Sequence, residues 1–302
     1  MTAFERRIRR REAIERASRL LRLAMAEEGE AASAALEASW EPLSEALAAA
    51  KGEAERAEVI AAVERLLRGG REDGAPARLR LLIRLHDVTA EGGAEAFALR
   101  LALAEVLRLQ GDADGAAAAA REALLCAGPD PVRRSEALLL LVEGLLGRSD
   151  VREAARWHRL RGPEPEDLRW LLQGARIAGR TGDTAAAERY LAEADAVSVR
   201  TPRKEGECPP RAQFHRTRVE VLAALGRLLE AADACEAALA VLARAEPSPP
   251  SPVDLERRLE IGEIWADLLG RLGDPREGRL RQETKALRAR LAALRGRHIR
   301  PL

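Results

Sequence analysis

A short Gly-Asp step that recurs between alanine- and leucine-rich segments is the feature that most constrains the fold. The step occurs at Gly111–Asp112, Gly182–Asp183 and Gly273–Asp274, and two looser versions stand at Ser149–Asp150 and Gly226–Arg227. Each step separates two segments with helical composition. Regular punctuation of this kind indicates an array of helical hairpins, in which each repeat is one helix-turn-helix unit.

The composition agrees with an all-α fold. Of the 302 residues, 47% are hydrophobic and only 3% aromatic, which is too apolar for a disordered chain. β-branched residues are too few for a β protein, whereas alanine, leucine, arginine and glutamate are strong helix formers. The length suffices for two compact domains or one long solenoid.

The charge and the cysteine content limit the classes of protein to which this chain can belong. The net charge is +1, so the molecule as a whole does not attract nucleic acid or a membrane surface. Cys126, Cys208 and Cys235 form neither a CxxC pair nor an even disulfide set, which indicates a reducing compartment. The N-terminus has no uninterrupted apolar core of a signal peptide, and no apolar run is long enough to span a membrane. We therefore expect a cytoplasmic protein.

Helix start and stop signals divide the chain into a less regular and a more regular part. Residues 1–92 form an N-terminal helical region of diverged repeats or a cap, with helices expected at 3–28, 30–41, 43–51, 53–68 and 76–88. Residues 93–295 form the repeats, paired as 94–110 with 113–127, 131–147 with 150–161, 166–181 with 184–197, 210–225 with 228–244, and 252–272 with 275–295. Residues 296–302 form a basic C-terminal tail.

Local signals refine several boundaries. Pro42 is expected to end or kink the helix that carries Trp40, because proline removes a donor and clashes one turn back. Asp274 with Glu277, and Asp150 with Glu153, have the spacing of a capping box. The proline-rich segments 199–211 and 244–252 lie between helix pairs and are expected to be exposed loops.

Small residues at fixed offsets from the turn carry a resemblance to a known family. Ala104 lies seven residues before Gly111, and Ala116 and Ala123 lie five and twelve after it. Ala175, Ala187 and Ala194 repeat these offsets around Gly182, Ala231 and Ala238 follow Gly226, and Ala266 and Gly278 flank Gly273. The pattern resembles the tetratricopeptide repeat family. It departs at Arg161, Val219 and Lys285, which stand where a small residue is expected.

The resemblance implies a right-handed α-solenoid of stacked antiparallel helix pairs, in which the first helix of each pair lines a concave face. The helical period assigns to this face Arg169, Leu172, Arg176 and Arg180 in the third pair, Gln213, Arg216 and Glu220 in the fourth, and Glu260, Glu263, Asp267 and Arg271 in the fifth. The face is thus predicted to be basic in the middle and acidic at the end.

The candidate partner-binding residues are Arg169, Leu172, Arg176, Arg180 and Arg216. Arginines so spaced could hold an acidic segment or a carboxylate of another protein through charge-assisted hydrogen bonds. The alternative is a solvated charged helix face. The four histidines lack HExxH spacing, and no phosphate loop or nucleophile elbow occurs. We therefore expect no enzyme activity, no cofactor and no metal.

The function that these observations favour is a non-catalytic scaffold or adaptor that binds a partner segment in the groove of the solenoid. Two alternatives stay open. The chain could be a regulatory subunit that meets nucleic acid through its basic ends, which are Arg6, Arg7, Arg9, Arg10 and Arg11 and the C-terminal RGRHIRPL. It could also be a structural oligomer in which exposed leucines pair between copies.

Overall fold

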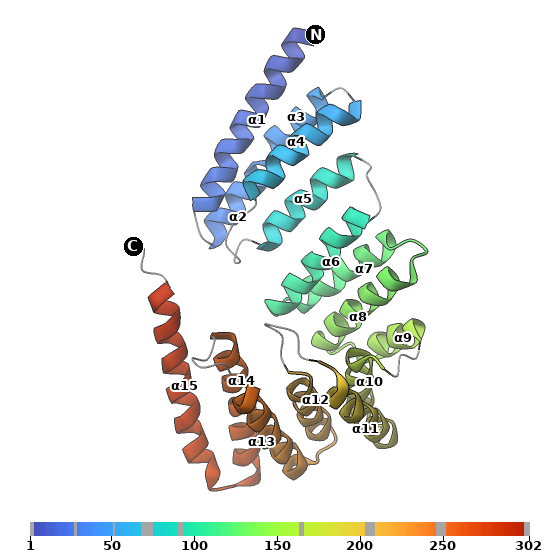
Figure 1. Cartoon of the computed structure of the whole chain (residues 1–302), viewed down its shortest axis with the longest axis vertical. Coiled ribbons are helices and arrows are strands. Elements are labelled where there is room, and N and C mark those ends of the chain that lie inside the picture. Colours follow the sequence, from blue (N-terminus) through green and yellow to red (C-terminus); the bar gives the residue numbers. More distant parts are fainter. Residues whose placement is uncertain are drawn as a thin grey trace. The chain divides into compact units, whose positions relative to one another are not determined.

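All regular structure in the described part of the chain is α-helical (Figure 1). The computed structural model describes residues 3–26, 29–50, 52–67, 75–89, 94–162, 166–202, 209–245 and 252–298. These residues confirm the predicted all-α fold. They divide into two compact units, residues 1–150 and residues 151–302, which we call the N-terminal and the C-terminal unit.

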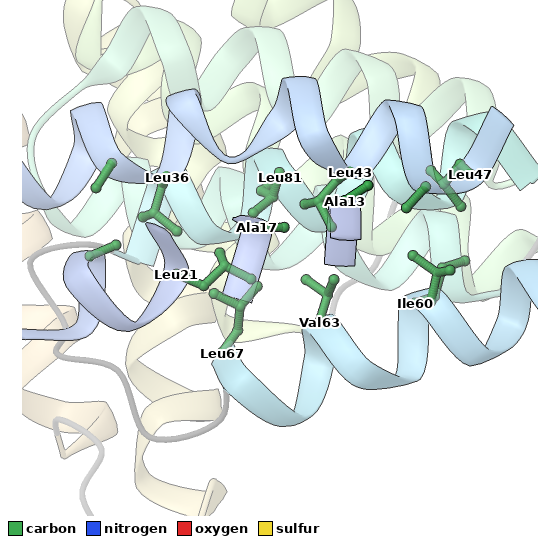
Figure 2. Packing of buried hydrophobic residues seen from close by; sticks show 14 residues of the cluster. Ala13, Ala17, Leu21, Leu36, Leu43, Leu47, Ile60, Val63, Leu67 and Leu81 are labelled. Carbon is green, nitrogen blue, oxygen red and sulfur yellow. The ribbon is translucent and has the colours of Figure 1, made fainter. Parts of the chain in front are cut away.

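The N-terminal unit begins with a small bundle and continues as a stack. Its helices are α1 (Ala3–Ala26), α2 (Gly29–Ala38), α3 (Trp40–Ala49), α4 (Gly52–Leu67), α5 (Ala75–Thr89), α6 (Ala94–Leu109), α7 (Ala113–Cys126) and α8 (Pro131–Gly147). Helix α1 packs against α2, α3 and α4 at once. Figure 2 shows its Ala17 and Leu21 among the buried residues Leu43, Val63 and Leu81. From α5 to α8 each helix packs on the next one.

The C-terminal unit consists of α9 (Val151–Arg161), α10 (Leu168–Thr181), α11 (Thr184–Arg200), α12 (Pro210–Ala224), α13 (Leu228–Ala245), α14 (Pro252–Leu272) and α15 (Arg276–His298). The pairs α10–α11, α12–α13 and α14–α15 form as predicted, and α10 packs on α12 and α13 on α14. This is the helical solenoid expected from the sequence. The expected pairing of 131–147 with 150–161 spans the two units and stays a prediction.

The recurring turn step ends one helix by a backbone device. Gly111, Gly182, Gly226 and Gly273 adopt φ angles of 66–80°, and Ser149 adopts 63°. The residue after each donates its N–H to a carbonyl oxygen five positions earlier, at 2.8–2.9 Å, in the pairs Asp112–Leu107, Asp150–Leu145, Asp183–Ala178, Arg227–Leu222 and Asp274–Leu269. These bonds satisfy carbonyl groups that the helix end would otherwise leave without a donor.

The aspartate of the step also starts the second helix. The carboxylate of Asp112 accepts the Gly115 N–H at 2.8 Å, and that of Asp183 accepts the Ala186 N–H at 3.0 Å. The full capping box predicted at Asp274 is not formed. The Asp274 N–H is already donated to the carbonyl oxygen of Leu269. The Glu277 carboxylate accepts a hydrogen bond from the Arg281 guanidinium instead.

One local expectation in the first 92 residues is resolved differently. Trp40 does not belong to the helix before Pro42; it begins α3, and Pro42 occupies the first turn of that helix. A proline in the first turn lacks an N–H that would have no partner there anyway. Pro42 therefore donates nothing to the carbonyl of Ala38, and its ring crowds that carbonyl, so α2 ends at Ala38. The break therefore falls at Ser39.

The central parts of both proline-rich loops, 203–208 and 246–251, lie outside the described residues.

Small residues occupy the points where helices approach one another. The alanines at the offsets of the resemblance are buried to 2% exposure or less, and they are Ala104, Ala116, Ala123, Ala175, Ala187, Ala194, Ala231, Ala238 and Ala266. A Cβ on Gly144 would lie 2.9 Å from the backbone nitrogen of Ala117, so α7 and α8 meet there closely. Gly278 is the exception: it is exposed, and a Cβ added to it would meet nothing within 4 Å, because α15 presents an outer surface at that point.

Two arginines within the helix stack are buried and paired. Arg161, which replaces an expected alanine, is 2% exposed and binds Asp167 at 2.6 Å. Arg100 of α6 binds Asp87 of α5 at 2.6 Å and lies 3.6 Å from Glu122 of α7. A buried charge without a partner would be costly, so these pairs explain how long basic side chains fit between packed helices.

Ser149→Gly is expected to stabilise the protein. Ser149 holds a left-handed conformation that costs an L-residue about 1–2 kcal/mol and costs glycine little, so the free energy of unfolding should rise by about 1 kcal/mol. Urea unfolding followed by circular dichroism measures this. Gly182→Ala, the opposite change at an equivalent turn, should lower stability by a similar amount. A Ser149→Gly variant no more stable than the parent would contradict this reading of the turn.

Candidate functional site

The predicted binding face lies on α10, α12 and α14 of the C-terminal unit. Helix α10 begins after Asp167, whose carboxylate accepts the N–H groups of Arg169 and Trp170 at 2.8 and 3.2 Å. Burial alone would raise the pKa of Asp167, but the Arg161 guanidinium and these two N–H groups lower it overall. The first turn of α10, which carries Arg169, is thereby fixed.

A ladder of ion pairs connects the three helices. Arg176 of α10 binds Glu220 of α12 through two contacts, Nε–Oε2 at 2.8 Å and Nη2–Oε1 at 3.0 Å. Glu220 also lies 3.7 Å from Arg216 on its own helix. Arg216 in turn binds Glu260 of α14 at 2.6 Å. We call the four residues Arg176, Glu220, Arg216 and Glu260 the charge ladder.

The charge ladder changes the electrostatic character of the predicted face. Arg176 and Arg216 are brought together through Glu220, and both are engaged by the chain's own carboxylates. The middle of the face is therefore not a cluster of uncompensated cations but a row of alternating charges. Binding of a partner along this face stays a prediction.

The remaining predicted residues occupy different environments. Leu172 is 7% exposed and belongs to the apolar core between α10 and its neighbours, so it supports the face from below. Arg169 and Arg180 are exposed. The helical period placed Glu220 and Glu260 on this face but did not reveal that they pair with the arginines. A signal was present: Arg176 and Glu220, and also Arg216 and Glu260, are 44 residues apart, as are the turn glycines Gly182 and Gly226.

The same arrangement occurs in the N-terminal unit. Arg108 of α6 binds Glu105 at 2.7 Å and lies 3.4 Å from Glu143 of α8. The hydrogen bonds that Arg108 donates to the Glu105 carboxylate are the main cause that raises the pKa of Arg108. Pairing between first helices of successive hairpins is thus a recurring feature of this chain.

The basic N-terminal end is partly neutralised as well. Arg10 forms an ion pair with Glu55, and Arg11 binds Glu15 at 3.1 Å. The side chain of Arg7 lies outside the described residues. So do residues 299–302 and the side chains of 296–298, which make up the predicted C-terminal tail.

Two buried histidines lie within the C-terminal unit. The Nε2–H group of His158 donates to the Trp170 carbonyl at 3.0 Å, and its ring stacks on the Trp170 indole with 4.6 Å between ring centroids. Burial lowers the pKa of His158, and the nearby Arg161 lowers it further, against the opposing effect of the Trp170 carbonyl. Burial, Arg211 and Arg218 lower the pKa of His215, opposed by Asp195.

Within the described residues, no group of three or more His, Cys, Asp or Glu side chains is placed to hold a metal ion. Cys126 is half-buried and Cys235 buried, and neither forms a disulfide. Burial raises the pKa of Cys235 to about 12. Cys208 and the side chains of His86 and His298 lie outside the described residues. In the same part of the chain, every helix is too short or too polar to cross a bilayer.

No protein-family model matches the sequence, and no curated protein matches it. Among solved structures, the chain is similar to BtubC (BKLC) from P. vanneervenii, with 20% sequence identity and a TM-score of 0.47. That match covers 82% of this chain and 93% of the other.

The two histidines predict a loss of stability in mild acid. Because their pKa values in the folded state lie below 6.5, the unfolded chain takes up protons first as the pH falls below 6.5. The free energy of unfolding should then fall by at most about 1.4 kcal/mol per pH unit for each histidine, until the folded-state pKa is reached. Above pH 6.5 their contribution is constant.

Urea unfolding at pH 7.5 and pH 5.5 measures this effect. The His158→Gln/His215→Gln variant should lose less stability between the two pH values than the parent does, whatever its stability at pH 7.5. Equal losses in the parent and the variant would show that other groups cause the dependence.

Proposed function

We propose that this chain is a non-catalytic scaffold of the tetratricopeptide type that works in the cytoplasm and binds a segment of a partner protein along α10, α12 and α14. The observation that carries the proposal is the charge ladder. It displays guanidinium and carboxylate groups in a continuous row across three adjacent first helices. An elongated polar ligand suits such a row better than a compact substrate.

The ladder can exchange partners at low cost. The side chains of Arg216 and Glu260 are 42% and 45% exposed, and exposed ion pairs contribute about 0–1 kcal/mol. An acidic segment can therefore replace Glu260 as the acceptor of Arg216. It would compete with Glu220 for Arg176, whose pair is less exposed, at 24% and 30%. The segment would gain charge-assisted hydrogen bonds while the chain loses the weak outer pair.

The fold gives the face the stiffness that binding requires. The buried alanines at Ala175, Ala187 and Ala231 let the helices approach closely, and Leu172 supports α10 from the core. Side chains held on packed helices lose little freedom when a ligand binds, which favours affinity. These small-residue positions are also the ones that support the tetratricopeptide assignment.

The charge ladder gives this proposal a two-sided test. Glu220→Gln/Glu260→Gln releases both arginines and should strengthen capture of an acidic partner about three- to tenfold, as expected for about 0.6–1.4 kcal/mol. Arg176→Glu/Arg216→Glu should weaken capture by at least as much. The measurement is quantitative mass spectrometry of proteins retained from a native-host lysate by the tagged full chain.

Glu236→Gln, on the exposed surface of α13, is the matched control and should retain the parental set of partners. Circular dichroism verifies that each variant is folded. A set of partners that is the same for the parent and both ladder variants would disprove binding at this face. Equally strengthened capture by the control variant would assign the effect to general charge rather than to the ladder.

A further inference from the structure

A second candidate anchor lies at the start of the C-terminal unit, in a cavity between α9, α10 and α11. We call it the α9–α11 cavity. Its volume is about 360 Å³, and its lining residues are His158, Arg159, Gly162, Trp170, Arg189, Tyr190 and Glu193. This volume falls at the lower end of the range of ligand pockets, about 300–1,000 Å³.

Three aromatic side chains give the cavity a fixed wall. His158 stacks on Trp170, and the Tyr190 ring meets Trp170 edge-on with 5.5 Å between centroids. Tyr190 is seated on Gly174, where an added Cβ would lie 2.7 Å from the ring. His158 and Trp170 are buried and only Tyr190 is half-buried. The rings therefore shape the cavity and do not offer open faces for stacking.

The charged groups of the cavity differ from most others in the protein. Within the described part of the chain, the side chains of Arg159, Arg189 and Glu193 form no hydrogen bond or ion pair. Arg189 and Glu193 are four residues apart on α11, the spacing at which side chains on a helix meet. Two other Arg–Glu pairs with this spacing do close, Arg11–Glu15 at 3.1 Å and Arg279–Glu283 at 2.9 Å.

The reason that Arg189 stays apart from Glu193 is the neighbouring ring. The Arg189 guanidinium lies over Tyr190, 5.4 Å from the ring centroid, a cation–π arrangement. A neighbouring cavity on α11–α13 shows the contrast, because Arg227 there binds both Glu188 and Glu230 at 2.6 Å. The α9–α11 cavity thus keeps two cations and one acceptor available on a rigid frame.

We propose that the α9–α11 cavity binds an acidic stretch of a partner protein, with Arg159 and Arg189 holding a side-chain carboxylate and Glu193 accepting a backbone N–H of the same stretch. The two guanidinium groups outnumber the one carboxylate, which favours an anionic ligand. Glu193 would repel a phosphate but suits an amide donor, so the groups match a peptide better than a nucleic acid. The inference rests on the proposed function and adds an anchor apart from the charge ladder.

A defined probe tests the proposal. Fluorescence anisotropy would follow binding of the full chain to a labelled twelve-residue peptide of alternating glutamate and glycine. Arg159→Glu and Arg189→Glu should each weaken binding at least about tenfold, because a hydrogen bond between charged groups contributes about 1.5–3 kcal/mol. Arg156→Glu is the matched control, since Arg156 is exposed on α9 and does not line the cavity. It should leave the affinity within about twofold of the parent.

Several outcomes would overturn the proposal. An equal loss in Arg156→Glu would show that the net charge of α9 attracts the peptide. A loss in Arg176→Glu/Arg216→Glu but not in the cavity variants would place the peptide on the charge ladder. Tighter binding of a twelve-residue oligothymidylate, lost in the cavity variants, would identify a nucleic-acid site. No binding of the peptide to the parent would exclude acidic segments. Arg159→Gln and Arg189→Gln replace any charge-reversal variant that circular dichroism shows to be unfolded.

The outcome of the peptide-binding test can be distinguished from the outcome of the lysate test of the proposed function. If the lysate partners still depend on the charge ladder while the peptide ignores Arg159 and Arg189, the scaffold function stands and the cavity anchor fails. If the peptide requires Arg159 and Arg189 while the lysate partners ignore the ladder, the cavity is the binding site and the ladder proposal fails.

Discussion

One backbone hydrogen bond across each hairpin turn organises the stack. It runs from the residue after the turn to a carbonyl five positions earlier, and it forms because the turn residue adopts a left-handed conformation. The aspartate that donates this bond at Gly111 and Gly182 also caps the next helix. The end of one helix and the direction of the next are thereby set within two residues. Alanines can then bring the helices together at fixed distances.

Two kinds of contact act between the hairpins, and they have different roles. Buried alanines and leucines supply the stabilising burial, whereas the exposed ion pairs contribute little each. The ion pairs instead connect the exposed surfaces of successive first helices, α10 with α12 and α12 with α14. A partner that competes for Arg176 would therefore reorganise surface charge without loosening the core. This separation lets one surface serve for recognition while the fold stays intact.

The sequence predicted the architecture well where its signals are local. The turn steps located the hairpins α6–α7, α10–α11, α12–α13 and α14–α15, and the offsets of Ala104 and Ala175 marked buried positions. The central position of α1 among α2, α3 and α4 was not predictable, because it depends on packing between segments without a repeat. Pairing of Arg176 was missed because a helical period gives the direction of a side chain but not its partner. The α9–α11 cavity is lined by residues from three helices, and no sequence motif indicates it.

The charge ladder also gives the hairpins an order. Within the ladder, α10 contributes only a cation and α14 only an anion, while α12 contributes both, Glu220 toward α10 and Arg216 toward α14. If α14 docked directly on α10 and left out α12, Arg176 would still face the anion Glu260, but one ion pair between helices would replace two. Both pairs form together only when the three hairpins stack in chain order.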